Sequence, residues 1–278
     1  MLPPVCILSS LLSRSNNAPP PSYPLSDMKI SIITVCYNSA KTIGDTLRSV
    51  HDQTYGDIEH IVVDGGSKDK TLEVVAAKGA HVAVLVSEKD NGIYDAMNKG
   101  IQIATGDVLA FLNADDFYQN SHVLAQVAKV MQAEQLDALY GDVEFFRPGQ
   151  RDSVARRYNS GRFSVGRLGW GWMPAHPALF VRRALFERYG TFRTDYRIAG
   201  DFEFIARVFK HPELRHRHLP ESLVRMQMGG ISTSGWRATL QLNREMMRAC
   251  RANAIPTNWL KMLLRYPFKA LEFFRTSA

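Results

Sequence analysis

The sequence predicts an α/β fold with a Rossmann-like, mostly parallel sheet, flanking helices and a helical C-terminal extension. In the first half of the chain, four short apolar stretches are rich in β-branched residues, as expected of buried strands. Between them, apolar residues recur at helical spacing, and each connection is long enough to cross over to a parallel strand. The chain has 278 residues, 45% of them hydrophobic and 22% charged, so it can bury a core of this kind.

Strands and helices are predicted to alternate along this half. The strands are expected at 29–37 (KISIITVCY), 58–64 (IEHIVVD), 81–88 (HVAVLVSE) and 107–114 (DVLAFLNA). Helices are expected after Asn38 and Ser39, at 71–77 with Ser67 as the cap, and at 93–104. Because the two element types alternate, the strands should run parallel, with their carboxyl ends at one edge of the sheet.

The pattern changes near residue 150. Residues 147–172 are rich in Gly and Arg and weakly periodic, which predicts a mobile loop beside a site. After this loop we expect a strand at 178–181 and helices at 182–190 and 199–210. The first turn of the last helix holds Asp201 and Glu203. His211, His216 and His218 interleave with Lys and Arg residues, and we interpret them as a solvated basic segment and not as a metal site.

The two ends of the chain differ from its middle. Residues 1–27 pass from a short apolar stretch into Ser, Asn and Pro, which predicts a disordered leader, and Met28 is then a candidate start. Residues 236–278 are expected to form a helical extension, with Pro267 interrupting or kinking its last helix. In that helix the apolar set is Leu260, Leu263, Leu264, Phe268, Leu271 and Phe274, and the charged set on the other face is Lys261, Arg265, Lys269, Glu272 and Arg275. The helix either packs on the core or lies on anionic lipid.

The net charge of +7 conceals an asymmetry between the two halves. Residues 1–150 carry 11 Lys and Arg against 18 Asp and Glu, a formal charge of −7. Residues 151–278 carry 23 against 9, a formal charge of +14. The first half therefore suits cations, and the second suits phosphates or a membrane surface. No nucleic-acid partner is expected, because no nucleic-acid-binding motif is present.

Cysteine usage and hydropathy bear on the compartment. Cys6, Cys36 and Cys250 are widely spaced and odd in number, which favours a reducing compartment over a disulfide framework or a zinc site. No run of about 18 apolar residues occurs, so no transmembrane helix is predicted. We expect a cytoplasmic protein that is peripheral on the inner face of the plasma membrane.

Polar residues follow each of the four predicted strands. They are Tyr37 and Asn38, then Asp64 and Gly65, then Glu88 and Asp90, and finally Asn113, Asp115 and Asp116. Carboxylates that converge on one rim repel each other unless a divalent cation or hydrogen-bond donors of a ligand compensate them. The alternative for the last pair is an ordinary turn in which Asp115 or Asp116 caps the next helix.

Two segments carry motifs in a characteristic order: SIITVCYNSAKTIGDTLRSVHDQTYGDIEHIVVDGGSKDKT and SEKDNGIYDAMNKGIQIATGDVLAFLNADD. They resemble family-2 glycosyltransferases with the GT-A fold. The resemblance is greatest to the bacterial branch that builds exopolysaccharide, colanic-acid-like or O-antigen repeat units, and it covers roughly residues 29–235. It implies a GT-A domain at 28–235, with a nucleotide-binding half at 28–118 and an acceptor-binding half at 119–235.

The resemblance also implies roles for single residues. The nucleotide-sugar would be bound by Tyr37, Asn38, Asp64, Gly65, Asp90, Asn113 and Ala114. Asn113-Ala114-Asp115 stands where the family has its D-x-D motif, with asparagine in place of the first aspartate. Asp115 and Asp116 are therefore both kept as ligands of Mg²⁺ or Mn²⁺.

On the acceptor side, Asp201 matches the catalytic base of the family, with Glu203 as the alternative. Aspartate has an ordinary pKa of about 3.9, so Asp201 would be ionised at neutral pH. His176 matches a position near the acceptor. The segment MGGIST at 228–233 matches a loop that closes over the diphosphate, where Ser232 would bind anions.

The function implied is inverting transfer of a single sugar by a non-processive hexosyltransferase, since the chain lacks Q-x-x-R-W and transmembrane helices. The donor expected first is a UDP-sugar, with GDP- and dTDP-sugars as alternatives. The acceptor expected is a lipid-linked saccharide, and an anionic membrane surface is a further partner. The competing hypotheses are a non-catalytic nucleotide- or carbohydrate-binding protein and a sugar-1-phosphate nucleotidyltransferase.

Overall fold

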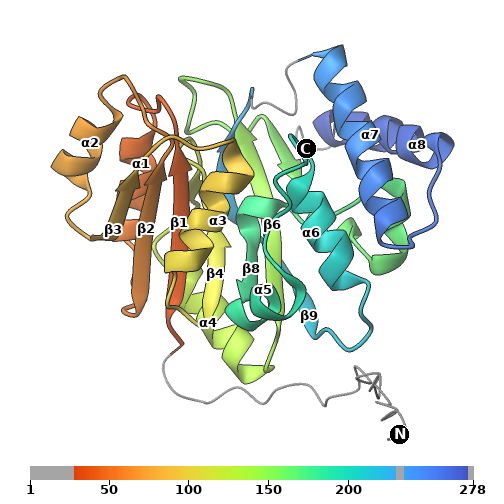
Figure 1. Ribbon diagram of the computed structural model, residues 1–278, viewed down its shortest axis with the longest axis horizontal. Coiled ribbons are helices and arrows are strands. Elements are labelled where there is room, and N and C mark those ends of the chain that lie inside the picture. The colour runs from red at the N-terminus through yellow and green to blue at the C-terminus, as the bar shows by residue number, and fades with distance from the viewer. Residues whose placement is uncertain (1–27, 230–234, 275–278) are drawn as a thin grey trace, which may run out of the picture.

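Figure 1 shows the computed structural model, which describes residues 28–229 and 235–274, the last seven of these by backbone alone. The predicted leader at 1–27 and most of the MGGIST loop, Ser232 included, lie outside the described residues. Within the described part, nine strands form one mixed sheet in the order β3-β2-β1-β4-β8-β6-β9-β5, with β7 paired to β6. The predicted α/β fold with a mostly parallel sheet is confirmed.

The first half of the sheet follows the prediction closely. The strands β1 (Ile30–Cys36), β2 (Ile58–Asp64), β3 (Val82–Ser87) and β4 (Val108–Phe111) pair in parallel. The crossover helices are α1 (Ile43–His51), α2 (Thr71–Lys78) and α3 (Ile93–Ile103). β1 is buried on both faces, which explains its unbroken apolar run. Ser67 does not cap α2 as predicted, because its hydroxyl donates to Asp64 and Lys70 is the N-cap residue.

The second half adds antiparallel strands to the sheet. Its elements are β5 (Phe117–Tyr118), α4 (Val123–Ala133), β6 (Ala138–Phe146), β7 (Arg156–Tyr158), β8 (Leu179–Arg182), α5 (Arg183–Tyr189), α6 (Gly200–Phe209) and β9 (His216–Gln227). Strand β8 runs antiparallel to both β4 and β6, and β9 runs parallel to β6. The sheet thus continues without a break from the first half into the second.

Two predictions for this half were wrong. The Gly- and Arg-rich stretch contains β7 and three short 3₁₀ helices (Ser160–Arg162, Val165–Trp170 and His176–Ala178), and it buries Leu168 and Trp172 in the core. His216 and His218 belong to β9, where the His216 ring packs on Phe209 and His218 contacts Asp142. Their imidazoles pack against the sheet, and the segment is not simply solvated.

The core lies in two layers, one on each face of the sheet. One cluster joins β1 and β2 to α3, α5 and α6, and the other joins β1 and β4 to α4. Helix α7 (Trp236–Ala252) belongs to the first cluster, because Met246, Met247 and Cys250 pack with the buried phenylalanines of α6. Figure 1 shows α7 and α8 (Trp259–Phe274) beside α6, at the edge of the molecule opposite β3.

Helix α8 packs on the fold through one face and leaves its other face exposed. Met262 and Arg265 are buried, whereas Trp259, Leu260, Leu263 and Leu264 are exposed. The prediction that Arg265 lies on an exposed polar face was therefore wrong. The helix is not interrupted at Pro267. No helix among the described residues is both long and apolar enough to cross a membrane.

The buried guanidinium of Arg265 connects α8 to the rest of the fold. It donates to the carbonyl of Gly171 at 3.0 Å and to Oδ1 of Asn243 on α7 at 2.9 Å. Gly171 has a φ of +76°, and a Cβ at this position would collide with the guanidinium. Glycine at 171 is thus required both by the backbone and by Arg265.

Candidate active site

The strand register gathers the predicted residues of the first half at one rim. Cys36 at the end of β1 pairs with Asp64 at the end of β2, and Asp64 pairs with Ser87 at the end of β3. A Cβ at Gly65 would collide with the carboxylate of Asp90, so only glycine allows these two loops to approach so closely. The loops after β1, β2 and β3 are therefore in contact.

Asp64 is fully buried, and its carboxylate is bound by its own loops. It accepts hydrogen bonds from the Ser87 hydroxyl at 2.7 Å, from the Ser67 hydroxyl and from the backbone N–H groups of Gly66 and Ser67. Burial raises the pKa of Asp64, but the bonds from Ser67, Ser87 and the backbone outweigh it and lower the pKa below its ordinary value. In this structure Asp64 organises the rim, and its contact with a nucleotide base stays a prediction.

Tyr37 and Asn38 lie directly beside this loop. The backbone N–H of Asn38 donates to the Ser67 hydroxyl at 2.8 Å, and its side-chain oxygen accepts from the Lys68 N–H at 2.9 Å. Asn38 has a φ of +51°, a conformation that asparagine tolerates better than most residues. Tyr37 is 58% exposed, so its ring can stack on a flat ligand above the rim.

The loop after β4 contains the two adjacent aspartates. Asp116 is almost fully buried, accepts from the Asn113 amide at 3.3 Å, and through its carbonyl accepts from the Thr46 hydroxyl at 2.8 Å. Burial, and then the charge of Asp115, raise the pKa of Asp116 well above its ordinary range. Burial also raises the pKa of Asp115. Ala114 is buried against Cys36 and therefore packs between the loops.

These residues fit a divalent cation. Asn113 Oδ1 is buried without a hydrogen-bond partner in the described part of the chain, and it adds a third oxygen to the two carboxylates. The described residues contain no cluster of three or more His, Cys, Asp or Glu side chains able to hold a metal. A cation here would thus share its coordination with oxygens of a ligand and with water, which is how Mg²⁺ is usually bound.

Asp201 lies in the first turn of α6 and is partly exposed. Its Oδ1 accepts a hydrogen bond from the Tyr94 hydroxyl at 3.1 Å and from the Phe202 N–H at 2.8 Å. Tyr94 comes from α3, so α3 and α6 together orient this carboxylate. No pattern in the sequence had singled out Tyr94, because its contact with Asp201 spans 107 residues of chain.

His176 packs against the end of β4. Its ring stacks on Phe111, the last residue of β4, with the ring centroids 5.3 Å apart. Burial lowers the pKa of His176 and outweighs the opposing effect of the nearby Asp201 carboxylate. Its Nε2 is buried and has no hydrogen-bond partner among residues 28–229 and 235–267. The unpaired nitrogen of a neutral imidazole can accept a hydrogen bond from a hydroxyl group.

Glu203, the alternative base, is engaged elsewhere. It is buried and accepts from Arg207 Nη2 at 2.9 Å and from the Asn253 amide at 3.4 Å. Arg207 also donates to the carbonyls of Tyr189, Gly190 and Thr191. Of the two carboxylates, Asp201 is therefore the one with oxygens available to a ligand.

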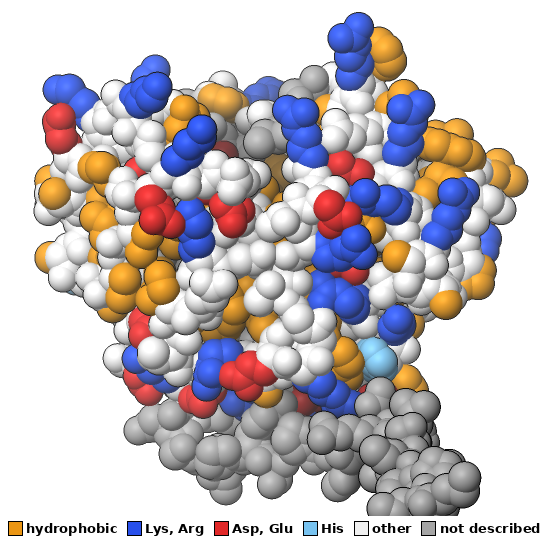
Figure 2. Space-filling model, in the orientation of Figure 1, with side chains coloured by type: hydrophobic (Ala, Val, Ile, Leu, Met, Phe, Trp, Pro, Cys, Tyr) orange, Lys and Arg blue, Asp and Glu red, His pale blue; other side chains and the backbone are white. Residues whose placement is uncertain are grey.

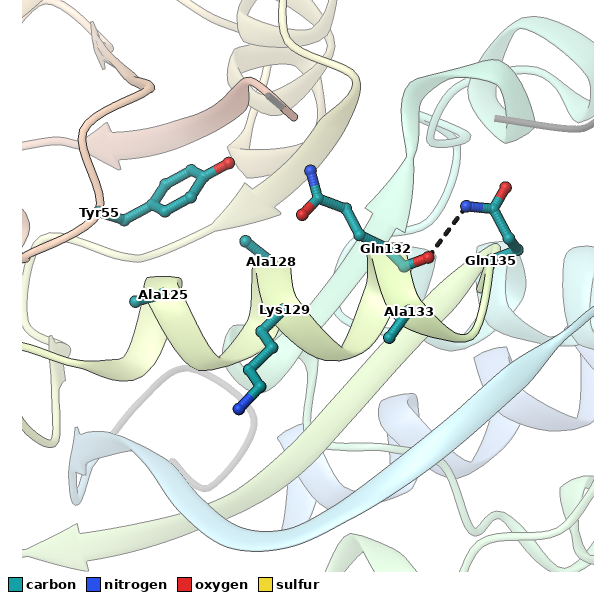
Figure 3. Close-up of a pocket in the computed structure, with 7 residues that line it drawn as sticks. All are labelled: Tyr55, Ala125, Ala128, Lys129, Gln132, Ala133 and Gln135. Carbon is teal, nitrogen blue, oxygen red and sulfur yellow. Dashed lines mark hydrogen bonds between the residues drawn. The ribbon is translucent and has the colours of Figure 1, made fainter. Parts of the chain in front are cut away.

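A hollow over α4 is a second feature of the surface, shown in Figure 3. It is lined by Tyr55, Ala125, Ala128, Lys129, Gln132, Ala133 and Gln135. Within it, the Gln135 amide donates to the Gln132 carbonyl at 2.9 Å. None of the predicted site residues lines this hollow, and no lining residue carries a carboxylate. It is not the candidate active site.

Comparison with known proteins identifies the family of this chain. The family model described as glycosyl transferase family 2 matches residues 31–190. A "PGL/p-HBAD biosynthesis glycosyltransferase" of Mycobacterium tuberculosis is 34% identical over 212 residues, which are 73% of this chain and 79% of that protein. Glycosyltransferase AglE of Haloferax volcanii is 30% identical over 187 residues, covering 64% of this chain and 60% of its own.

Solved structures share the fold. S. aureus TarS in complex with UDP-GlcNAc superposes with a TM-score of 0.62 at 20% identity over 80% of this chain and 66% of that one. Mannosyltransferase PcManGT from Pyrobaculum calidifontis, in complex with GDP-Man and Mn²⁺, gives 0.59 at 23% identity over 83% and 66%. The chain spans slightly less than two thirds of either structure. At these identities the likeness shows a GT-A-like fold.

Proposed function

The chain belongs to glycosyl transferase family 2, and on this premise we propose that it moves a single hexose, with inversion, from a nucleoside-diphosphate donor to a saccharide acceptor. The observation that carries the proposal is the arrangement around His176. Its ring stacks on Phe111 at the end of β4, the strand that leads to Asp115 and Asp116, and the nearby Asp201 carboxylate acts on its pKa. We infer that this unpaired imidazole lies between the acidic rim and the base.

The donor would lie on the rim of strand ends. Tyr37 would stack on the base, and Asn113 would accept a hydrogen bond from a sugar hydroxyl. When bound to Asp115 and Asp116, a divalent cation supplies positive charge to the diphosphate. UDP is the nucleotide we propose first, with GDP and dTDP as alternatives. TarS was solved with UDP-GlcNAc and PcManGT with GDP-Man and Mn²⁺, so this fold accommodates more than one nucleotide.

The acceptor would be activated by Asp201. The acceptor oxygen forms a bond to the anomeric carbon, its proton passes to an Asp201 oxygen, and the bond from that carbon to the diphosphate breaks with its electron pair. His176 Nε2 would orient the acceptor hydroxyl. Tyr94 would hold the carboxylate in place through its hydroxyl.

We propose that the acceptor is a saccharide carried on a lipid, at the cytoplasmic face of the plasma membrane. The mycobacterial relative is named for PGL/p-HBAD biosynthesis and not for exopolysaccharide, colanic acid or O-antigen, so those products are not favoured over other glycoconjugates. The surface of α8 supports a lipid-linked acceptor independently of any relative.

That surface is an exposed apolar patch, which we call the α8 patch, made of Trp170, Trp259, Leu260, Leu263 and Leu264. Leu260 is 66% exposed and Leu263 52%. Lys261 Nζ lies 5.8 Å from the centroid of the Trp170 ring, so the charged end of the chain covers an aromatic ring. Tryptophan beside lysine is the combination that favours the boundary between lipid and water.

Positive charge lies next to the α8 patch. Figure 2 shows Lys and Arg side chains along α7 and a hydrophobic area over the start of α8 at the edge of the same face. Arg237, Arg244 and Arg251 of α7 are exposed and form no ion pair with the described residues. Each such residue near an anionic bilayer contributes about 1 kcal/mol. We therefore propose an anionic lipid surface as the partner of α7 and α8.

The function is tested by incubating the full chain with labelled UDP-, GDP- and dTDP-sugars, bacterial lipid extract and Mn²⁺. We expect one donor to label the lipid fraction with a single sugar per acceptor. A non-catalytic binding protein would retain the donor without releasing nucleoside diphosphate. A nucleotidyltransferase would instead release pyrophosphate from a nucleoside triphosphate and a sugar 1-phosphate, and either result would overturn the proposal.

A further inference from the structure

The backbone just before α6 is held by one side chain of α7. The carboxylate of Glu245 accepts hydrogen bonds from the backbone N–H groups of Ile198 and Ala199, both at 2.9 Å, and of Arg197 at 3.2 Å. The Gln241 amide, one turn earlier on α7, donates to the same carboxylate at 3.0 Å. Three consecutive amides, the last of them two residues before Asp201, thus converge on one partly buried carboxylate.

The same short segment is held on its other side by Tyr94. The Tyr94 hydroxyl is 2.7 Å from the Ile198 carbonyl and 3.1 Å from Asp201 Oδ1. A Cβ at Gly200 would collide with the Tyr94 ring, so the ring fits against the backbone itself. The segment at 197–200 is therefore held between α3 and α7, and it leads directly into the residue that carries the base.

We propose that Glu245 is a positioning residue for catalysis: through the amides of 197–199 it sets where the Asp201 carboxylate points. The proposal rests on the proposed function, since it assumes that Asp201 acts as the base. It extends the catalytic machinery into the helical extension at 236–278, beyond the domain that the family resemblance implies. Glu245 itself touches neither the carboxylate of Asp201 nor the rim.

The charge of Glu245 matches this role. Burial raises its pKa, but the backbone N–H bonds and Gln241 outweigh that effect and lower the pKa below its ordinary value. Glu245 is thus ionised at neutral pH, and its bonds to the amides are of the stronger, charge-assisted kind. A displacement of about 1 Å at a reacting group costs about a hundredfold in rate, so small shifts of this segment matter.

The experiment compares Glu245→Ala, Glu245→Gln and a matched control in the full chain, below the unfolding temperature of each variant. The control is Asp195→Asn, which removes the exposed ion pairs of Asp195 with Arg193 and with Arg248 of α7 without touching the three amides. We expect Glu245→Ala to lower kcat about ten- to a hundredfold while the donor KM stays within about twofold. Glu245→Gln keeps an acceptor oxygen and should recover part of kcat, and Asp195→Asn should match the wild type.

A second readout does not need activity. Hydrogen exchange of the amides at 197–199 and in the first turn of α6 should rise in Glu245→Ala and stay unchanged in Asp195→Asn. Unchanged exchange, or a lower melting temperature with an unchanged kcat, would overturn the positioning role. If the wild type transfers no sugar but the amides at 197–199 still exchange faster in Glu245→Ala, the proposed function is wrong and the contact of Glu245 with these amides remains.

Discussion

The two adjacent aspartates of the first half differ from three buried carboxylates of the second half. In the second half, Asp142, Asp137 and Glu203 are buried and each is paired with an arginine, respectively Arg157, Arg215 and Arg207. In the first half, Asp115 and Asp116 lie side by side, and both have raised pKa values because burial is not offset by a cation of the protein. Asp201 belongs to the second half by sequence but has no arginine partner among the described residues.

The difference separates structural carboxylates from functional ones. A buried carboxylate paired with arginine has its charge compensated already, so removing either partner costs stability. A carboxylate left without a cation is costly in the free protein and becomes favourable only when a ligand supplies the missing charge or proton. By this criterion we propose that Asp115, Asp116 and Asp201 form the site and that Glu203 supports the fold.

The largest effect is expected at Asp201. Asp201→Asn removes the base but keeps an oxygen that accepts from Tyr94, so the fold should be retained while kcat falls by about 10² to 10⁴. Steady-state transfer kinetics with the labelled donor measure this directly. An Asp201→Asn variant with near wild-type kcat would break the distinction between paired and unpaired carboxylates.

Glu203 should show the opposite behaviour. Glu203→Gln leaves Arg207 without its carboxylate partner in a buried setting, and we expect a loss of about 3 to 5 kcal/mol in unfolding free energy. Urea unfolding measures the loss, and the kcat of the folded fraction should stay close to that of the wild type. A stable variant with low kcat would make Glu203 the base.

The two adjacent aspartates of the first half should differ in their effects on metal-dependent binding and on stability. Asp115 receives no side-chain hydrogen bond in the described part of the chain, whereas Asp116 is held by Asn113. We therefore expect Asp115→Asn to weaken Mn²⁺-dependent donor binding by about ten- to a hundredfold with little change in stability. Asp116→Asn should lower the melting temperature as well. Titration calorimetry with and without Mn²⁺ would contradict this if only Asp116→Asn lost the metal effect.

The α8 patch should show a smaller effect, seen in binding to vesicles. Replacing Leu260, Leu263 and Leu264 together by Ser should lower flotation with vesicles that contain phosphatidylglycerol by at least about tenfold. The matched control is Leu85→Ser, which removes an exposed leucine from the edge strand β3 at the far side of the sheet. Equal binding to neutral vesicles would exclude charge complementarity, and loss of a dimer in the triple variant would make the patch an interface between copies.

The last prediction concerns the pH dependence of stability at a buried histidine away from the candidate site. Burial, and then the adjacent His81, lower the pKa of His60 from its ordinary 6.5 to about 3. The unfolded state therefore takes up a proton first, so the stability that His60 contributes is full above pH 6.5 and declines as the pH falls towards 3. His60→Gln should flatten this decline in urea unfolding, whereas the exposed control His122→Gln should not. An unchanged decline would show that other groups cause it.

The elements predicted correctly are those whose signal lies within their own residues. The buried strands β1, β2 and β4 carry their own apolar signal, and glycine and acidic residues mark the turns that follow them. By contrast, β9 is rich in charged residues and exists because it pairs in parallel with β6, far away in the sequence. The sequence pattern of β9 does not predict that it pairs with β6. For this reason the prediction that its histidines are solvated was wrong.

The residues of the candidate site also differ in whether a local pattern could predict them. Residues directly after strands, such as Asp64 and Asp115, could be placed at one rim from the strand pattern alone. Tyr94 and Glu245 act on the segment before Asp201 through contacts that span 104 and 46 residues, and neither lies next to a strand end. Arg265 was assigned to solvent because an arginine on a helix face is usually exposed, whereas here Gly171 leaves room for it inside.

The central claim is that the acidic rim binds a nucleoside-diphosphate sugar together with a divalent cation. Thermal unfolding of the full chain with UDP-, GDP- and dTDP-sugars, each with and without Mn²⁺, tests it most directly. At a concentration of 100 times its dissociation constant, a donor should stabilise the fold by about 2.7 kcal/mol. We predict this shift for one nucleotide, enlarged by Mn²⁺ and lost in Asp115→Asn. A folded protein that shifts with none of the donors would contradict the claim.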